Sequence, residues 1–170
     1  MLNIEQSVVN KFPGFATRAP LIRKSTLTLL RKLTREQEIN RFLHDNEGNR
    51  GLDFIERIFD YFNFSYSVPH RERNNIPAQG RVVIIANHPI GSLDGLALLK
   101  LVSEVRRDVK IIANDMLMAF EPLRELLLPL DNMTRSAYRQ SYKNILQALN
   151  NEEAVIVFPA GEVSRASPKG

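Results

Sequence analysis

Three short apolar runs alternate with longer helical segments in the second half of the chain, and this alternation largely decides the fold. The runs read RVVIIAN (81–87), VKIIAN (109–114) and EAVIVF (153–158). Short and almost wholly apolar runs are typical of strands buried on both faces. Segments with helical character lie at 92–106, 115–127 and 135–150. The pattern predicts an α/β fold with a mainly parallel central sheet covered by helices.

The first part of the chain predicts helices without strands between them. Helical patterns cover residues 20–33, 34–45 and 51–64, and the second of these opens with Thr34 and Gln37 at the spacing of a capping box. The polar, turn-rich stretch PHRERNNIPAQG follows. We therefore expect two parts, an N-terminal helical layer over 1–70 that faces a membrane and an αβ core over 71–170.

Composition and charge exclude several classes of protein for this chain. The 170 residues include no cysteine, which excludes disulfides, thiolate catalysis and cysteine-bound metals. No apolar run reaches the roughly 18 residues of a membrane-spanning helix, and the N-terminus lacks the apolar core of a signal peptide. The charge is uneven: seven basic residues and one acidic residue in 1–35 give +6, whereas 16 basic and 18 acidic residues give −2 elsewhere. Such a basic segment indicates an anionic partner surface.

The segment PLIRKSTLTLLRKL (20–33) has two interpretations. Ile22, Leu29 and Leu33 share one side of a helical wheel, whereas Lys24 and Arg31 share the other. The helix either packs its apolar side into a core or lies in a membrane interface with its basic side toward anionic lipid. Aromatic residues that would stack on bases are sparse in this region, which disfavours single-stranded nucleic acid.

The motif NHPIGSLDG (87–95) joins the first strand to the next helix. Ser92 is expected to cap the helix, which places Asp94 in the first turn, where an acid complements the helix dipole. His88 either caps the strand or acts as a base. Local physics leaves the structural and the catalytic interpretation open.

The catalytic interpretation requires these residue types in this order. Neutral imidazole is suited to take a proton near pH 7, and a carboxylate on its other ring nitrogen fixes the tautomer. A base of this kind supports transfer of an acyl group from a thioester to a hydroxyl or an amine. Backbone amides at the start of the helix would stabilise the oxyanion.

These residues resemble a known family. NHPIGSLDG is similar to the His–Asp signature of the glycerolphosphate and lysophospholipid acyltransferase superfamily, and VIVFPAGEVSR (155–165) resembles its later Phe-Pro-Glu-Gly-Thr-Arg-Ser block. The segment 114–135 resembles, more loosely, the block between them. The chain has five residues between His88 and Asp94 instead of four, and Ala160 in place of the acid of the later block, with Glu162 two positions on. Both departures resemble the hemolysin-like or ornithine-lipid acyltransferase branch.

The resemblance implies roles for particular residues. His88 and Asp94 would be catalytic. Contacts to substrate would come from Asn87, Gly91, Arg135, Gly161, Glu162, Ser164 and Arg165. The acyl donor would be an acyl carrier protein or coenzyme A thioester and the acceptor a lysolipid, with no cofactor and no metal. The departures make a glycerol-3-phosphate acceptor doubtful.

Two other functions remain to be separated from this one. The first is a non-catalytic module that binds a membrane or nucleic acid through residues 11–35, and the second is an ester hydrolase that uses the same dyad with water as acceptor. We expect the acyltransferase to be cytoplasmic and peripheral to the inner face of the cell membrane, bound through residues 11–35 and without a nucleic-acid partner. The αβ core is also expected to continue beyond residue 170 to close its acyl pocket.

Overall fold

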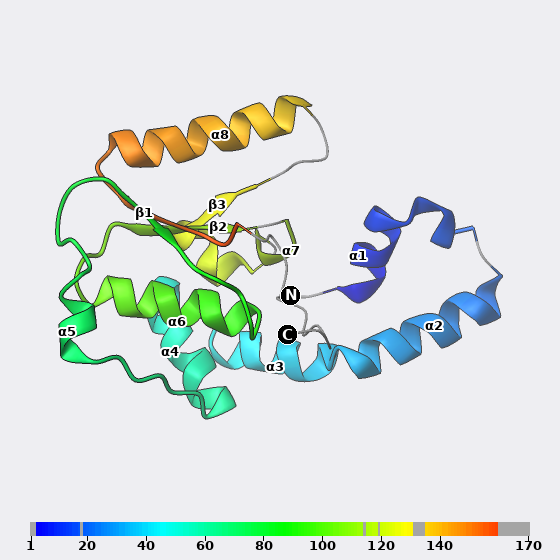
Figure 1. Cartoon of the computed structure of the whole chain (residues 1–170). Coiled ribbons are helices and arrows are strands. Elements are labelled where there is room, and N and C mark those ends of the chain that lie inside the picture. Colours follow the sequence, from blue (N-terminus) through cyan, green and yellow to red (C-terminus); the bar gives the residue numbers. More distant parts are fainter. Residues whose placement is uncertain (1–2, 18, 114, 119, 131–134, 160–170) are drawn as a thin grey trace, which may run out of the picture. The chain divides into compact units, whose positions relative to one another are not determined.

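A computed structural model describes residues 3–17, 19–113, 115–118, 120–130 and 135–159 of the 170-residue chain (Figure 1). The chain forms two compact units, residues 1–48 and residues 49–170. Each unit is described by itself.

The first unit is wholly helical in its described part. It consists of α1 (Ile4–Lys11), the 3-10 helix η1 (Pro13–Phe15), α2 (Pro20–Leu33) and α3 (Glu36–Asp45). Proline opens α2 at a position where its missing N–H is not needed. Leu27 is the buried apolar residue of α2.

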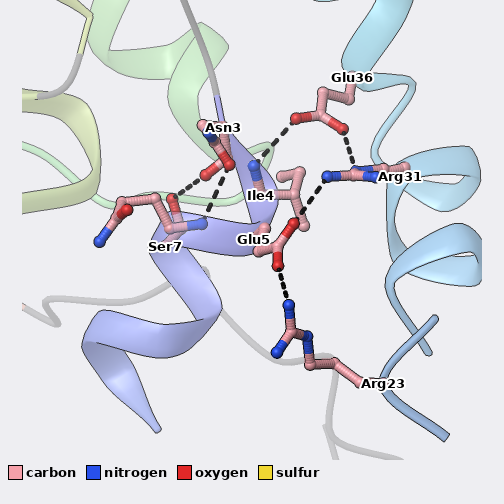
Figure 2. A network of polar contacts seen from close by, with 8 residues as sticks. Asn3, Ile4, Glu5, Ser7, Arg23, Arg31 and Glu36 are labelled. Carbon is pink, nitrogen blue, oxygen red and sulfur yellow. Dashed lines mark hydrogen bonds and ion pairs between the residues drawn. The ribbon is translucent and has the colours of Figure 1, made fainter. Parts of the chain in front are cut away.

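A network of ion pairs joins the three α-helices of this unit (Figure 2). Glu5 in α1 accepts from Arg23 at 3.0 Å and from Arg31 at 3.2 Å, both in α2. Glu36 binds Arg31 Nε at 3.0 Å and accepts the backbone N–H of Ile4, also at 3.0 Å. The expected capping box at Thr34 is wrong: α3 begins at Glu36, after Arg35 in the left-handed region, and the Thr34 hydroxyl donates to the Leu30 carbonyl. Glu36 is therefore used to bind neighbouring helices.

The second unit is an αβ layer structure. Its elements are α4 (Gly51–Phe62), α5 (His70–Arg73), β1 (Val82–Ile85), α6 (Ser92–Ser103), β2 (Val109–Ala113), α7 (Asp115–Met118), the 3-10 helix η2 (Glu121–Leu126), β3 (Leu127–Pro129), α8 (Arg135–Asn150) and β4 (Ala154–Val157). The four strands form one sheet in the order β1-β4-β2-β3, and every neighbouring pair is parallel. The predicted α/β class with a parallel sheet is confirmed.

Helices cover both faces of this sheet (Figure 1). On one face α8 packs on β3 and β4, where Val155 and Leu128 meet Ala148 in a buried cluster. On the other face α6 packs on β2, and α4 packs on α6. Alternate residues of β4 point toward the two helical layers, because successive side chains of a strand lie on opposite faces of the sheet.

Two details of the sheet differ from the sequence prediction. Residues 127–129 form a strand, β3, which was not expected: the sequence predicted short helical pieces over 115–127 and no element at 128–129. Leu127 and Leu128 are buried beside β2. The strand β1 was expected to be buried, yet it lies at an edge, with Val83 48% and Ile85 69% exposed. Val83 pairs with Val155 and so lies on the face where α8 packs on β3 and β4; β3, the other edge strand, is covered by this helix, whereas this face of β1 is left exposed.

The division between the units also lies elsewhere than the expected boundary near residue 70. Helix α4 belongs to the αβ unit because it packs against η2 and α6. Its residues Phe54 and Ile55 are buried. The polar stretch 69–80 is fixed to the same unit by Arg106, which is 5% exposed. The guanidinium donates to the carbonyls of Pro77 (3.2 Å) and Gly80 (2.6 Å).

No helix in the described ranges is both long enough and apolar enough to cross a membrane.

Candidate active site at the carboxyl edge of the sheet

Two motifs emerge side by side from neighbouring strands. The strand β1 leads to His88 and the strand β4 leads to Phe158, and the two strands pair in register from Val82 with Ala154 to Ile85 with Val157. The pairing continues one residue further, where the Ala86 N–H donates to the Val157 carbonyl at 3.2 Å. Ligands of open parallel sheets bind at this carboxyl edge.

The turn between β1 and α6 depends on Gly91. Its φ of 97° and ψ of −142° lie in a region that is open essentially to glycine alone. Gly91, rather than the expected Ser92, is the N-cap residue, and Ser92 is the first residue of α6. The motif with five residues between histidine and aspartate is thus accommodated by one glycine in an unusual conformation.

The carboxylate of Asp94 ties this turn together. Its Oδ2 accepts the backbone N–H groups of Ile90 at 2.7 Å and Gly91 at 3.0 Å. An acid in the first turn also complements the positive end of the helix dipole. Asp94 therefore stabilises the turn whether or not it also takes part in catalysis. It also engages the amides of Ile90 and Gly91, which leaves neither of these two donors for an oxyanion.

His88 lies against the same carboxylate. Its Nδ1 is 3.4 Å from Asp94 Oδ2, and the side chains of the two residues are 19% and 15% exposed. Nδ1 is buried and makes no hydrogen bond within the described part of the chain. A buried polar group left unpaired costs about 1–3 kcal/mol, and a small closure toward Asp94 would remove this cost. Catalytic hydrogen bonds are often long in ligand-free structures.

The face of the imidazole ring rests on Phe158. The ring centroids are 4.4 Å apart and the planes are inclined by 30°. The same ring lies near Gly95 in α6. A Cβ at this position would meet Phe158 Cε2 at an ordinary contact distance of 3.6 Å and would be tight only against Ile111 Cδ1, at 3.0 Å. With Nδ1 facing Asp94, the nitrogen left to meet a substrate is Nε2. The arrangement is suited to moving a proton at that atom.

The other residues singled out from the sequence are placed unequally. Asn87 is exposed between β1 and His88, and Gly91 is buried in the turn. Arg135 is the first residue of α8, and its side chain is not described. Gly161, Glu162, Ser164 and Arg165 lie outside the described residues. The structure therefore brings together His88, Asp94 and Gly91, and it leaves the expected acceptor contacts as predictions.

Sequence reasoning missed Phe158 and Gly95. Both lie inside the quoted motifs, but a phenylalanine after a buried strand and a glycine in a helix carry no chemical signal of their own. Only the three-dimensional neighbourhood links them to His88. Among the described residues, no three His, Asp or Glu side chains gather to hold a metal ion.

Perturbed pKa values mark structural contacts of the αβ unit. Burial and a hydrogen bond to Glu104 raise the pKa of Tyr66 to about 12. A hydrogen bond from the Arg106 guanidinium lowers the pKa of Asp108. Arg106 pairs with Asp108 in a fork, with both nitrogen–oxygen distances at 2.8 Å. These groups fasten the connection into β1 and the start of β2.

Comparisons with known proteins show which family the chain resembles. A family model described as acyltransferase matches residues 6–168. The lyso-glycine lipid O-acyltransferase of Bacteroides thetaiotaomicron is 32% identical over 154 residues, which are 88% of this chain and 56% of that protein. The protein of the same name from Phocaeicola vulgatus is 30% identical over 145 residues, 85% of this chain and 51% of its own length. The chain thus spans about half the length of these curated relatives. No solved structure gives a significant match.

Proposed function

This chain belongs to the acyltransferase family, and we propose that the protein transfers a fatty acyl group from a thioester to the hydroxyl of a lysolipid. His88 is the general base and Asp94 the carboxylate that orients it. The observation that carries the proposal is the buried His88 Nδ1, which makes no hydrogen bond to any described residue and faces Asp94 Oδ2 at 3.4 Å. In this position the carboxylate selects the tautomer whose Nε2 has a free lone pair.

The reaction that this arrangement supports balances without a nucleophilic residue. The acceptor hydroxyl gives its proton to His88 Nε2 while its oxygen attacks the thioester carbonyl carbon. A C–O bond forms, and collapse of the tetrahedral intermediate breaks the C–S bond. The thiolate leaves and takes the proton back from the imidazolium. Asp94 stabilises that imidazolium while it exists.

The substrates are proposed from the relatives and from the sequence motif. The two relatives are named for O-acylation of a lyso-glycine lipid, which supports an acceptor that is a lysolipid with a free hydroxyl. Arg135, Glu162, Ser164 and Arg165 would contact its head group, because an arginine fork binds a phosphate or carboxylate at two points. The donor is an acyl carrier protein or coenzyme A thioester, and no cofactor is required.

The N-terminal unit supports contact with an anionic membrane through residues 11–35. Ile22, Leu29 and Leu33 of α2 have exposed apolar side chains, and Lys24 and Lys32 are exposed on the same helix. Exposed apolar and cationic side chains on one helix suit an interfacial position. We propose on this basis that the enzyme is peripheral to the inner face of the cell membrane.

Vesicle binding tests this membrane contact. Arg31 is held by Glu5 and Glu36, so charge reversal is best restricted to Lys24→Glu with Lys32→Glu. Binding should need anionic lipid and weaken with added salt. Lys143→Glu in α8 is the matched control for charge reversal. Equal binding to neutral vesicles would contradict the electrostatic part, and salt-sensitive duplex binding without vesicle binding would favour nucleic acid.

The function is tested by offering the whole protein labelled acyl thioesters and a panel of lysolipids. We expect acylated product with at least one acceptor and a loss of about 10²–10⁴-fold in His88→Ala. Release of free fatty acid at the same rate without any acceptor would instead indicate the hydrolase. No turnover with any donor or acceptor, with vesicle binding intact, would favour the non-catalytic membrane module.

A further inference from the structure

We propose that Phe158, which follows directly from the strand β4, is a positioning residue for the catalytic histidine. The inference rests on the proposed function, because it assigns a role toward the base that the function requires. It extends the site from the turn after β1 to the neighbouring strand β4 and to the first turn of α6.

The need for such a residue follows from how His88 is held. Asp94 faces Nδ1 at 3.4 Å without a hydrogen bond, so the carboxylate alone does not fix the plane of the ring. The contact that defines this plane is the one with Phe158, at 4.4 Å between centroids and 30° between planes. Offset or tilted stacking of aromatic rings is favourable at this separation. Rotation of the imidazole about its side-chain bonds would break the stacking and carry Nδ1 away from Asp94.

The position of Phe158 is in turn fixed from two sides. Its backbone follows directly from β4, whose residues Ala154, Val155 and Ile156 are fully buried between the helical layers. Its ring lies beside Gly95, where an added Cβ would come within 3.6 Å of Cε2. Gly95 immediately follows Asp94 in the sequence, so one turn of α6 lies beside both His88, through Asp94, and the ring of Phe158. Strand, helix and histidine are thereby coupled through one aromatic side chain.

The experiment compares Phe158→Leu with Phe158→Tyr in the whole protein. Leucine keeps apolar volume but removes the aromatic face, whereas tyrosine keeps the face. Phe54→Leu is the matched control, because it makes the same chemical change at a fully buried position of α4. For each variant we would measure kcat and KM for both substrates, and record the NMR signals of the His88 ring protons, assigned with His88→Ala.

We expect kcat of Phe158→Leu to fall by about 10–100-fold, because a misplacement of about 1 Å at a reacting group costs up to about 10²-fold. KM should change by less than about threefold, since the acceptor and donor contacts are elsewhere. The upfield ring-current shift of the His88 protons should disappear in Phe158→Leu and persist in Phe158→Tyr, which should also regain most of kcat. If Phe158→Leu does not fold, Phe158→Met provides the same comparison.

Three results would overturn the inference: unchanged kcat after the ring-current shift is lost, an equal fall of kcat in Phe54→Leu, or no ring-current shift in the unmutated protein. Failure of the proposed function has a different signature. In that case His88→Ala keeps full activity, while the NMR signals still report whether the two rings are stacked.

Discussion

Substitution of Asp94 by asparagine separates the two roles that the structure gives to this carboxylate. Asp94 Oδ2 holds the amides of Ile90 and Gly91 at 2.7 and 3.0 Å and also faces His88 Nδ1. Asparagine keeps the shape and one acceptor oxygen, so both amides can remain bonded. The two bonds change from charge-assisted to neutral, which lowers the free energy of unfolding by about 1–2 kcal/mol. The imidazolium, however, loses its counter-charge.

The magnitudes make the two roles distinguishable. A domain with a stability of about 5 kcal/mol or more stays over 99% folded after a loss of about 2 kcal/mol. Unfolding therefore cannot explain a large loss of activity. If Asp94 orients the base, kcat should fall by about 10²–10⁴-fold. If Asp94 only supports the turn, activity per folded molecule should stay close to the original value.

The assay is acyl transfer from a labelled thioester to a lysolipid, run beside urea unfolding of the same preparations. Asp53→Asn is the matched control, because Asp53 is an exposed acid in the first turn of α4. It should lose a few tenths of a kcal/mol of helix stabilisation and no activity. A kcat of Asp94→Asn within about twofold of the unmutated protein would refute the orienting role.

Three further predictions concern the scaffold. Gly91→Ala forces a side chain into φ 97°, so unfolding should become easier by about 1–3 kcal/mol and kcat should fall; unchanged urea unfolding would contradict the conformation. Arg106→Ala removes the donor to the Pro77 and Gly80 carbonyls and should cost about 3 kcal/mol in the same measurement, whereas a loss below about 1 kcal/mol would show that these bonds contribute little. The pKa of Asp108 is lowered in the folded state, so its stabilisation is fully present above the unfolded pKa near 4 and is lost as the pH falls through the lower folded pKa. The acid limb of a stability–pH curve should accordingly be shallower in Asp108→Asn, and identical limbs would count against the linkage.

The sequence predicted the fold best where a single helix or strand has a recognisable local pattern of apolar and polar residues. The apolar runs at 81–87, 109–114 and 153–158 correctly predicted the strands β1, β2 and β4, because short apolar runs between helices leave few alternatives. The short strand Leu127–Pro129 was not predicted, because three residues are too few to show an alternation of apolar and polar side chains and they follow a proline-interrupted helical pattern. The exposure of β1 was not predicted either, because it depends on the position of β1 at the edge of the sheet, and strand order cannot be read from one segment.

In the candidate site, too, the sequence predicted the local features and missed the contacts between distant segments. A histidine and an acid at the two ends of one turn could be recognised because both belong to a continuous stretch, 88–94. Phe158 lies 70 residues further along the chain, and its place beside His88 depends on β1 and β4 being neighbours. Glu36 was similarly not singled out by its sequence position, although it binds Arg31 and the amide of Ile4 from other helices. Contacts between distant segments follow from topology, which local patterns do not encode.

The proposed His88–Asp94 dyad is best tested with the double mutant of His88→Ala and Asp94→Asn, assayed for acyl transfer beside the two single mutants in the whole protein. In the proposed mechanism the two side chains serve one proton transfer. The double mutant should therefore be little worse than His88→Ala alone, because the carboxylate has nothing to orient once the imidazole is gone. Losses that multiply would mean that the two residues act independently, and that result would contradict a His88–Asp94 dyad.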